Sequence, residues 1–435
     1  MSIDQLDADA YRRVEATLPW LWWSAAVVFR AAGDDRAAVP LLERTRRSAA
    51  RYPRGLALGD LACVYGYSGE LRAALECILE LEALVDAAAR PGWAGLIRLH
   101  LRLSLARAIV AASELRLDAM ADHLDAAEVL VEAVVPHPAG SESTWRLAIT
   151  VARVHHAALS GEGERALRVA ESFGRVGQRG EGAAAAGVDR TMQGLAFGAR
   201  LTALLSAGVP GGVVAAAAEP NGTCRDHHNV CVPTMQALAA LSAGMPGVAL
   251  RLTDDCYRSS DRHNARTRLQ VLAVRAGAFL AGGRTQSAIA TLDRAIVLAD
   301  PSGPMSLTLL PSQLLDELID LFGRQHPRLP DSVTRVAGRP RSGLDTIAET
   351  FALLTPREWD VLTALRTGKT LDEIARDQFT ARNTIASQCR SIYAKLSVAS
   401  RVEAVERAER AQAFSLLAFA ASRQGALPSD GEFGA

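Results

Sequence analysis

Apolar and polar residues along this chain follow a pattern that suits helices. No run of alternating Val, Ile, Thr or Tyr residues, as a half-buried strand would need, is present in the sequence. Aromatic residues make up only 5% of the chain, whereas alanine is abundant. The pattern therefore predicts an all-α protein.

A recurring layout of two helices predicts a repeat array over roughly residues 15–325. Each copy has a helix-forming stretch, a glycine that can end it, a few polar residues, and a second helix with a small residue early in it. The clearest copy starts at Leu61, and its large, small and turn residues are Leu61, Ala62, Tyr65, Gly69, Ala74 and Ile78. Leu81 stands in that copy where a small residue is usual.

Further copies repeat the turn glycine and the small residue. A second clear copy ends at Ala295 and contains Phe279, Gly283, Ala288 and Leu292; weaker copies pair Gly33 with Ala38, Gly161 with Ala166, and Gly244 with Ala249. Neighbouring copies lie about 36 to 40 residues apart, which suits a helix-pair solenoid. The layout resembles tetratricopeptide-like arrays, whose concave face binds peptides, proteins or small molecules. An irregular helical bundle with coincidental spacing is the alternative.

Three segments interrupt this layout. Residues 174–198 are rich in glycine and residues 208–228 break the pattern, so we expect loops or hinges in both. After Phe322 the chain is rich in Pro and Arg, which predicts a linker. The predicted division is residues 1–325 for a helical-repeat region that senses or interacts, 326–350 for the linker, 351–412 for a C-terminal domain, and 413–435 for a tail.

Three capping boxes predict the starts of short helices in the C-terminal domain. A capping box pairs a Ser or Thr with a Glu three residues later, and each side chain accepts a hydrogen bond from the other's backbone N–H. The pairs are Thr355 with Glu358, Thr370 with Glu373, and Ser400 with Glu403. Pro356 follows the first cap, where its missing N–H costs nothing, and Gly368 is placed to end the first helix.

Another helix is predicted from about Arg382 to Leu396. Its apolar residues form one stripe at helical spacing: Ile385, Cys389, Ile392 and Leu396. Its outward face is small, polar or basic: Arg382, Asn383, Ala386, Ser387, Arg390 and Ala394. Two short helices joined by a tight turn, with no acid on the outward face of the second, fit the major groove of B-DNA.

The C-terminal residues together resemble LuxR-type helix-turn-helix regulators. The residues that carry the resemblance are Leu354-Thr355-Pro356-Arg357-Glu358, Val361-Leu362, Gly368, Glu373-Ile374-Ala375, Phe379, Thr384-Ile385, Ile392-Tyr393, Lys395-Leu396, Val398, Arg401 and Ala404-Val405. They cover a small part of the chain, but their order and spacing are specific. The resemblance implies a DNA-binding domain of four helices, with double-stranded DNA as its partner.

The resemblance also implies where DNA is contacted. The family's three recognition positions fall on Ala386, Ser387 and Arg390, of which Arg390 can reach a phosphate or the O6 and N7 atoms of guanine. The residues expected to contact DNA are Arg382, Asn383, Thr384, Ser387, Gln388, Arg390 and Lys395. The sequence departs from the family at Ala386, where lysine is usual, at Gln388, where histidine is frequent, and at Ala381, where serine usually caps this helix. These departures bear on specificity and affinity.

The last helix of the family often pairs two copies on DNA. Val402 and Val405 resemble such a dimer seam, and a homodimer would bind two half-sites about one helical turn apart. Plain core packing is the alternative for Val402.

Charge and composition exclude several classes of protein. The chain has 48 Lys and Arg and 48 Asp and Glu, so it has no overall field towards nucleic acid or an anionic membrane, and any DNA affinity must be local. Its six cysteines are too sparse for a disulfide-stapled secreted domain. Residues 1–11 are acidic and Pro19 interrupts the apolar stretch 18–29, so we expect neither a signal peptide nor a membrane span. We predict a cytoplasmic protein without a membrane partner.

No catalytic site or cofactor is expected. Gly368-Lys369-Thr370 is similar to the end of a phosphate-binding loop, but Thr363 replaces the earlier glycine and no strand precedes it, so we interpret it as a helix end and a cap. No Ser, His and Asp set and no phosphorylatable receiver pattern can be assembled. Large LuxR-type regulators carry an ATP-binding module before a similar repeat region, and this chain resembles them only from the repeats onward. ATP hydrolysis is therefore not expected.

One cluster has the residue types of a metal site. Cys224, His227, His228 and Cys231 are thiol and imidazole donors at tight spacing. The spacing matches no standard zinc finger, and such side chains are usually packed or solvated. We therefore expect no metal site and keep these four residues only as weak candidates.

Together these patterns predict a transcription regulator that binds specific DNA sequences. Its helical array would bind a signal ligand or a protein partner and change how the C-terminal domain is presented. The alternative is a protein-interaction scaffold whose helix-turn-helix is vestigial or serves only dimerisation. Ala386, Ala381 and the balanced net charge favour that alternative.

Overall fold

The computed structural model of the chain describes residues 3–87, 94–133, 141–173, 190–217, 230–326, 328–337, 354–415 and 418. Every regular element in these residues is a helix, which confirms the all-α prediction. None of the described helices is long and apolar enough to cross a membrane.

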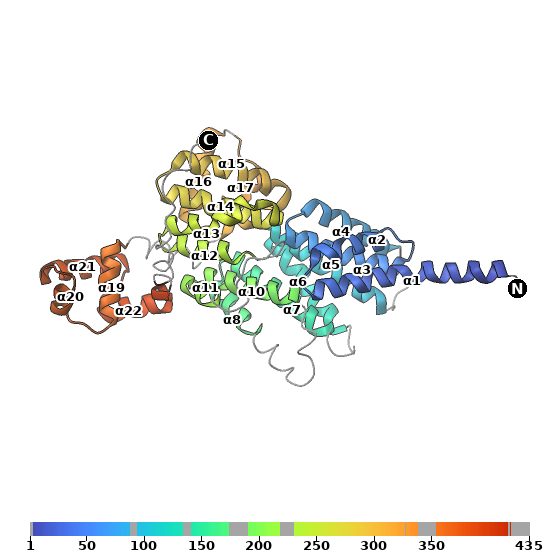
Figure 1. Cartoon of the computed structure of the whole chain (residues 1–435), viewed down its shortest axis with the longest axis horizontal. Helices are drawn as coiled ribbons and strands as arrows, with labels where there is room; N and C mark the ends of the chain where they lie inside the picture. Colours follow the sequence, from blue (N-terminus) through green and yellow to red (C-terminus); the bar gives the residue numbers. More distant parts are fainter. Residues whose placement is uncertain are drawn as a thin grey trace.

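The helices up to Ala337 form successive pairs, each joined by a turn (Figure 1). The pairs are α1 (Ile3–Ala31) with α2 (Asp35–Arg46), α3 (Arg51–Ser68) with α4 (Leu71–Asp86), α5 (Ala94–Ser113) with α6 (Leu117–Ala133), α7 (Ser141–Leu159) with α8 (Gly163–Glu171), α10 (Arg190–Ser206) with α11 (Pro210–Ala217), α12 (Val232–Ser242) with α13 (Pro246–Arg258), α14 (Ala265–Ala281) with α15 (Thr285–Ser302), and α16 (Ser312–Gln325) with α17 (Asp331–Ala337). Two short 3-10 helices, η1 (Ser260–Arg262) and η2 (Pro304–Leu309), lie between pairs. These helix pairs are the array.

The predicted turn glycines occupy the turns within pairs. All of them have positive φ, a conformation that costs glycine little: Gly33, Gly69, Gly161, Gly244 and Gly283. The small residues that follow in the second helices are all 0% exposed: Ala38, Ala74, Ala166, Ala249 and Ala288. The turn at Gly69 is also crowded, because a Cβ there would lie 2.8 Å from the backbone nitrogen of Arg266. Small residues thus let the paired helices approach closely.

Two pairs, besides that of α16 and α17, lack part of this signal. The pair of α5 and α6 turns at Leu115, with φ 60°, and its second helix buries Met120 where the other copies have alanine. The pair of α10 and α11 turns at Gly208, with φ 74°, and buries Val213 at the corresponding position. A bulkier residue fits there when the neighbouring helix recedes, so the small-residue pattern does not reveal these two pairs.

Parts of the expected interruptions are therefore helical. The expectation of loops or hinges is wrong for residues 190–198, which lie in α10, and for residues 210–217, which form α11. Residues 174–189 and 218–229 lie outside the described part of the chain. Likewise, α17 falls within the expected linker and buries Val333 and Val336 in the core of the array.

The last pairs of the array contact its first pairs. Helix α14 contacts α3, and η2 contacts α5; both α3 and α5 come from the beginning of the chain. Arg266 of α14 donates hydrogen bonds to the Gly66 carbonyl oxygen (2.8 Å) and to Ser113 Oγ (2.6 Å). The array therefore curls back on itself rather than running open from end to end.

The C-terminal helices form a lobe with its own core. These are α19 (Pro356–Arg366), α20 (Leu371–Asp377), α21 (Arg382–Lys395) and α22 (Arg401–Arg410). Ala413 and Phe414 complete the core of this lobe, although we expected a tail from residue 413. Figure 1 shows the lobe at the end of the molecule opposite the start of α1, next to α11. The Gly211 backbone N–H donates to the Ala411 carbonyl oxygen (3.3 Å), which joins the lobe to the array.

Candidate nucleic-acid interface and the cavity of the array

Capping side chains begin the helices of the C-terminal lobe as the sequence predicts. The Glu358 N–H donates to Thr355 Oγ1 (3.3 Å) and the Thr355 N–H to Glu358 Oε2 (2.7 Å), with the same reciprocal pair at Thr370 and Glu373. The third box is only half formed, because the carboxylate of Glu403 accepts from the N–H of Ala399 and the hydroxyl of Ser400 instead of from the Ser400 N–H. Thr370 is thus a helix cap, as we interpreted it.

Buried Glu358 joins α19 to the second helix of the helix-turn-helix, α21. Its carboxylate is 5% exposed and accepts hydrogen bonds from Ser391 Oγ (2.6 Å) and Lys395 Nζ (2.6 Å). Burial alone would raise the pKa of Glu358, but the hydrogen bonds from Lys395, Ser391 and Thr355 outweigh it and lower the pKa to about 2. Glu358 is therefore ionised, and it fixes the position of α21 within the lobe.

One face of α21 is open to solvent. Five of the residues expected to contact DNA are exposed: Arg382, Asn383, Thr384, Ser387 and Arg390. Arg382 forms a solvent-exposed ion pair with Asp372 (3.2 Å). Arg390 forms no ion pair with any residue that the structure describes. We call these five residues the reading face, and Arg390 is its unpaired cation.

The other two expected DNA contacts lie away from the reading face. Gln388 is half-buried, and its side-chain oxygen accepts no hydrogen bond within the described residues. The ammonium of Lys395 is held by Glu358. The structure thus gives Lys395 a partner inside the lobe, whereas the sequence predicted only a contact with DNA.

The turn before α21 carries an exposed aromatic side chain. Phe379 has φ 50° and is 98% exposed. Ala381 then begins α21 without a side-chain cap, as its departure from the family predicts. The sequence indicated Phe379 only as part of the family pattern, and its exposure beside the reading face was not predicted.

The two valines of the predicted dimer seam differ in burial. Val402 is 63% exposed, so the alternative of plain core packing does not apply to it. Val405 is half-buried and packs against the core of the lobe. Only Val402 therefore presents a free apolar surface on α22.

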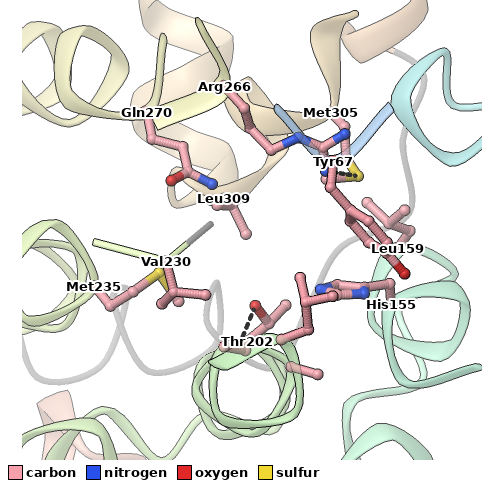
Figure 2. A pocket seen from close by; sticks show the side chains of 13 residues that line it. Tyr67, His155, Leu159, Thr202, Val230, Met235, Arg266, Gln270, Met305 and Leu309 are labelled. Carbon is pink, nitrogen blue, oxygen red and sulfur yellow. Dashed lines mark hydrogen bonds between the residues drawn. The ribbon is translucent and has the colours of Figure 1, made fainter. Parts of the chain in front are cut away.

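A cavity lies where helices from distant parts of the array converge (Figure 2). It has a volume of about 60 Å³, enough for a few water molecules, and α3, α7, α10, α12, α14 and η2 line it. Its apolar wall includes Leu195, Val230, Met235 and Leu309, and its polar groups come from Tyr67, His155, Thr202, Arg266 and Gln270. Its mixed lining is that of a small-molecule site, but its volume is well below the roughly 300–1,000 Å³ usual for such sites.

Arg266 gives this cavity a half-buried positive charge. Within the described residues its guanidinium contacts only neutral groups, namely the Gly66 carbonyl oxygen, Ser113 Oγ and the Met305 sulfur. Burial lowers the pKa of Arg266 to about 10, so it stays charged near neutral pH. Burial and the nearby Arg266 cation lower the pKa of His155 to about 4, so His155 is neutral there. Among the described residues, the cavity therefore has a cation without a counter-charge.

The structure regroups the weak metal candidates. Cys224, His227 and His228 lie outside the described residues. Cys231 caps α12, and its sulfur lies 3.4 Å from that of Cys256. The sequence could not indicate this contact, because 25 residues and a whole helix separate the two cysteines.

Comparison with known proteins places the C-terminal lobe in a family. Residues 352–408 match the family described as bacterial regulatory proteins, luxR family. The lobe is therefore a LuxR-type helix-turn-helix domain, which confirms the resemblance found in the sequence.

Particular relatives share this domain. It is similar over 57 residues to the HTH-type transcriptional regulator MalT of Yersinia pestis (strain Pestoides F), at 46% identity. The MalT protein of Yersinia enterocolitica serotype O:8 is 44% identical over 57 residues. These matches cover 13% of this chain and 6% of each relative, so the chain spans a small fraction of the relatives that it matches.

Proposed function

We propose that this protein is a transcription regulator that binds specific DNA sequences through the reading face of α21. The observation that carries the proposal is the exposed, acid-free face of α21 in a LuxR-type domain, with Arg390 as its unpaired cation. Such a helix fits the major groove, where arginine binds guanine edges or phosphates. A regulator of this kind acts in the cytoplasm, where the bacterial chromosome lies.

Each residue of the interface has a role in this proposal. Arg390 contacts guanine or a phosphate, and Asn383, Thr384 and Ser387 donate or accept hydrogen bonds beside it. Lys395 acts through Glu358, because its ammonium orients α21 from inside the lobe. Gln388 joins the contacts only if its half-buried side chain rotates outward.

The direct test is binding of the full chain to a pool of random duplex DNA at two salt concentrations, followed by fluorescence anisotropy. Arg390→Ala should weaken binding by about 1–3 kcal/mol if Arg390 reads a base, or lower the salt slope by about one if it contacts a phosphate. Arg72→Ala is the matched control, since Arg72 is 93% exposed on α4 of the array. Failure of the wild-type chain to bind even at low salt would favour the scaffold alternative.

Ala386→Lys tests whether the departure from the family at this position weakens DNA binding, because it adds a cation where Arg390→Ala removes one. A lysine there restores the family's usual cation, so it should raise affinity and steepen the salt slope by about one. An unchanged slope would show that residue 386 does not face the phosphates.

We further propose that two copies pair on DNA through α22. Val402 supports this, because an exposed valine gains by burial in a symmetric contact. Val402→Glu should remove cooperative binding to two half-sites without unfolding the lobe. Val405 is a poorer probe because it packs against the core. Cooperativity that survives Val402→Glu would exclude this seam.

The array in this proposal receives a small anionic ligand with an apolar body. A half-buried guanidinium without a counter-charge among the described residues supports this, because a carboxylate would satisfy Arg266 while apolar atoms contact the wall near Leu195 and Met235. Thermal shifts of the full chain should be larger with acetate than with acetamide or ethylamine, and Arg266→Met should abolish the difference. Equal shifts with all three would instead favour a peptide or protein partner on the array.

The signal would pass to the lobe through α10 and α11. Helix α10 lines the cavity and packs on α11, where a Cβ on Gly211 would collide with the Gln412 carbonyl oxygen. Gly211→Ala should therefore separate the lobe from the array and uncouple DNA affinity from ligand. Gly194→Ala is the matched control, because a Cβ there meets no atom within 4 Å. Coupling that persists in Gly211→Ala would contradict this route.

We also propose domain limits that follow the packing. The array extends to Ala337, where α17 ends, and the DNA-binding domain runs from Leu354 to Ser415. Any linker is then confined to residues between these two units.

A further inference from the structure

We propose that Cys231, Cys256 and His263 bind a zinc ion that ties α12, α13 and the start of α14 together. The three residues are 1%, 4% and 7% exposed. The two sulfurs and a ring nitrogen of His263 all lie within 4.8 Å of one another. Each residue comes from a different place in the fold: the cap of α12, the last turn of α13, and the position after η1.

The distances fit one tetrahedral ion after a small movement. Two thiolates at ~2.3 Å from a tetrahedral zinc ion stand about 3.8 Å apart. The two sulfurs lie 3.4 Å apart, which is close to that value and much longer than the ~2.05 Å of a disulfide bond. A sulfur and a nitrogen bound to the same zinc ion stand about 3.5 Å apart. The ring nitrogen of His263 lies within 4.8 Å of both sulfurs, so it would move towards them by at most about 1.3 Å.

The chemistry also favours zinc. Binding requires both thiols to lose their protons, so two protons leave as one Zn²⁺ enters and the protein-bound ion carries no net charge. A neutral site can be buried at little electrostatic cost, whereas an uncompensated charge cannot. Thiolate and imidazole ligands together select zinc over the hard cations calcium and magnesium.

A tetrahedral ion needs a fourth ligand. A water molecule can take this position, and it would leave the ion open to exchange.

The ion would stabilise the part of the array that forms the cavity. His263 directly precedes Asn264, which caps α14 by accepting a hydrogen bond from the Thr267 N–H (2.9 Å). Arg266 lies in the first turn of α14, and Val230, next to Cys231, lines the same cavity. Zinc would thus hold the cavity's cation in place, as a structural rather than a catalytic ion.

Metal content of the full chain, purified without chelator or affinity tag, is the first test. We expect about one zinc per chain in the wild type. Cys231→Ser, Cys256→Ser and His263→Asn should each lower it well below one. Cys63→Ser and His100→Asn are matched controls outside the site and should keep the ion.

Two further measurements distinguish metal loss from misfolding and from a disulfide. After removal of metal, cobalt(II) added to the wild-type chain should give the visible bands of a tetrahedral site and a thiolate charge-transfer band, and zinc should raise the Tm. A thiol count in denaturant with chelator should find all six cysteines reduced. Absence of zinc together with no cobalt spectrum would overturn the proposal, and so would two missing thiols, since these would show a disulfide.

Discussion

Glu358 and Arg266 are both charged side chains in the protein interior, but the protein satisfies them differently. Glu358 has Lys395, Ser391 and a backbone N–H around its carboxylate. Arg266 has only neutral acceptors among the described residues, and it faces a cavity. The charge of Glu358 is neutralised within the lobe, whereas no described residue neutralises the charge of Arg266.

The difference shows how the two regions are specialised. A fully paired buried charge specifies one position for α21, so the reading face is preformed for DNA. A buried cation with no counter-charge costs stability unless a ligand supplies the anion. The lobe therefore presents a fixed surface, whereas the Arg266 charge in the array is not neutralised by any described residue.

The largest effect is expected from breaking the pair in the lobe. Lys395→Met leaves the Glu358 carboxylate buried without its cation, which should destabilise the lobe by about 3 kcal/mol. Hydrogen exchange of peptides from residues 354–415 should then speed up, while peptides from the array stay protected. Unchanged exchange in the lobe would mean that Ser391 and the backbone alone satisfy Glu358.

Acid should affect the two regions at different pH. His155 has a pKa of about 4 in the array, below its ordinary 6.5, so the unfolded chain takes up the proton first and stability falls by about 2 kcal/mol from pH 6.5 to 4. Glu358 has a pKa lowered from 4.5 to about 2, so its contribution is lost only between those values.

Thermal melts across this pH range check the order. His155→Asn should flatten the loss of array stability between pH 6.5 and 4, and His100→Asn, at an exposed position of α5, should not. A wild-type melting temperature that does not change from pH 7 to 4.5 would contradict the assignment of a neutral His155.

The smallest change in stability is expected at Arg266. Arg266→Met removes a charge that has no ionic partner among the described residues, so the free energy of unfolding of the array should stay within about 1 kcal/mol of the wild type or rise. Lys395→Met, by contrast, should lower the free energy of unfolding of the lobe by about 3 kcal/mol. Chemical denaturation without added ligand measures this, and a large loss at Arg266 would show that its bonds to Gly66 and Ser113 are essential for folding.

The sequence predicted the lobe well because its signals are local. A cap and its glutamate lie three residues apart, and the buried stripe of α21 follows helical spacing, so Thr355, Thr370, Ile385 and Ile392 were placed correctly. The role of Lys395 was not predictable, because its partner Glu358 lies 37 residues away.

The array was predictable where each pair follows the glycine and alanine pattern. It was missed where Leu115 replaces the turn glycine and where Met120 and Val213 replace alanine, since no local signal marks those pairs. The cavity could not be predicted either, because Tyr67, His155 and Arg266 meet only when distant pairs pack together. Such contacts depend on the curvature of the whole array.

The contact of α14 with α3 also limits how this protein can evolve. Open solenoids gain or lose a repeat by duplication or deletion, since each repeat touches only its neighbours. Here one additional pair between α3 and α14 would displace Arg266 from Gly66 and Ser113 and open the cavity. A change in the number of repeats between α3 and α14 would therefore cost this contact, whereas substitutions within the cavity would keep it.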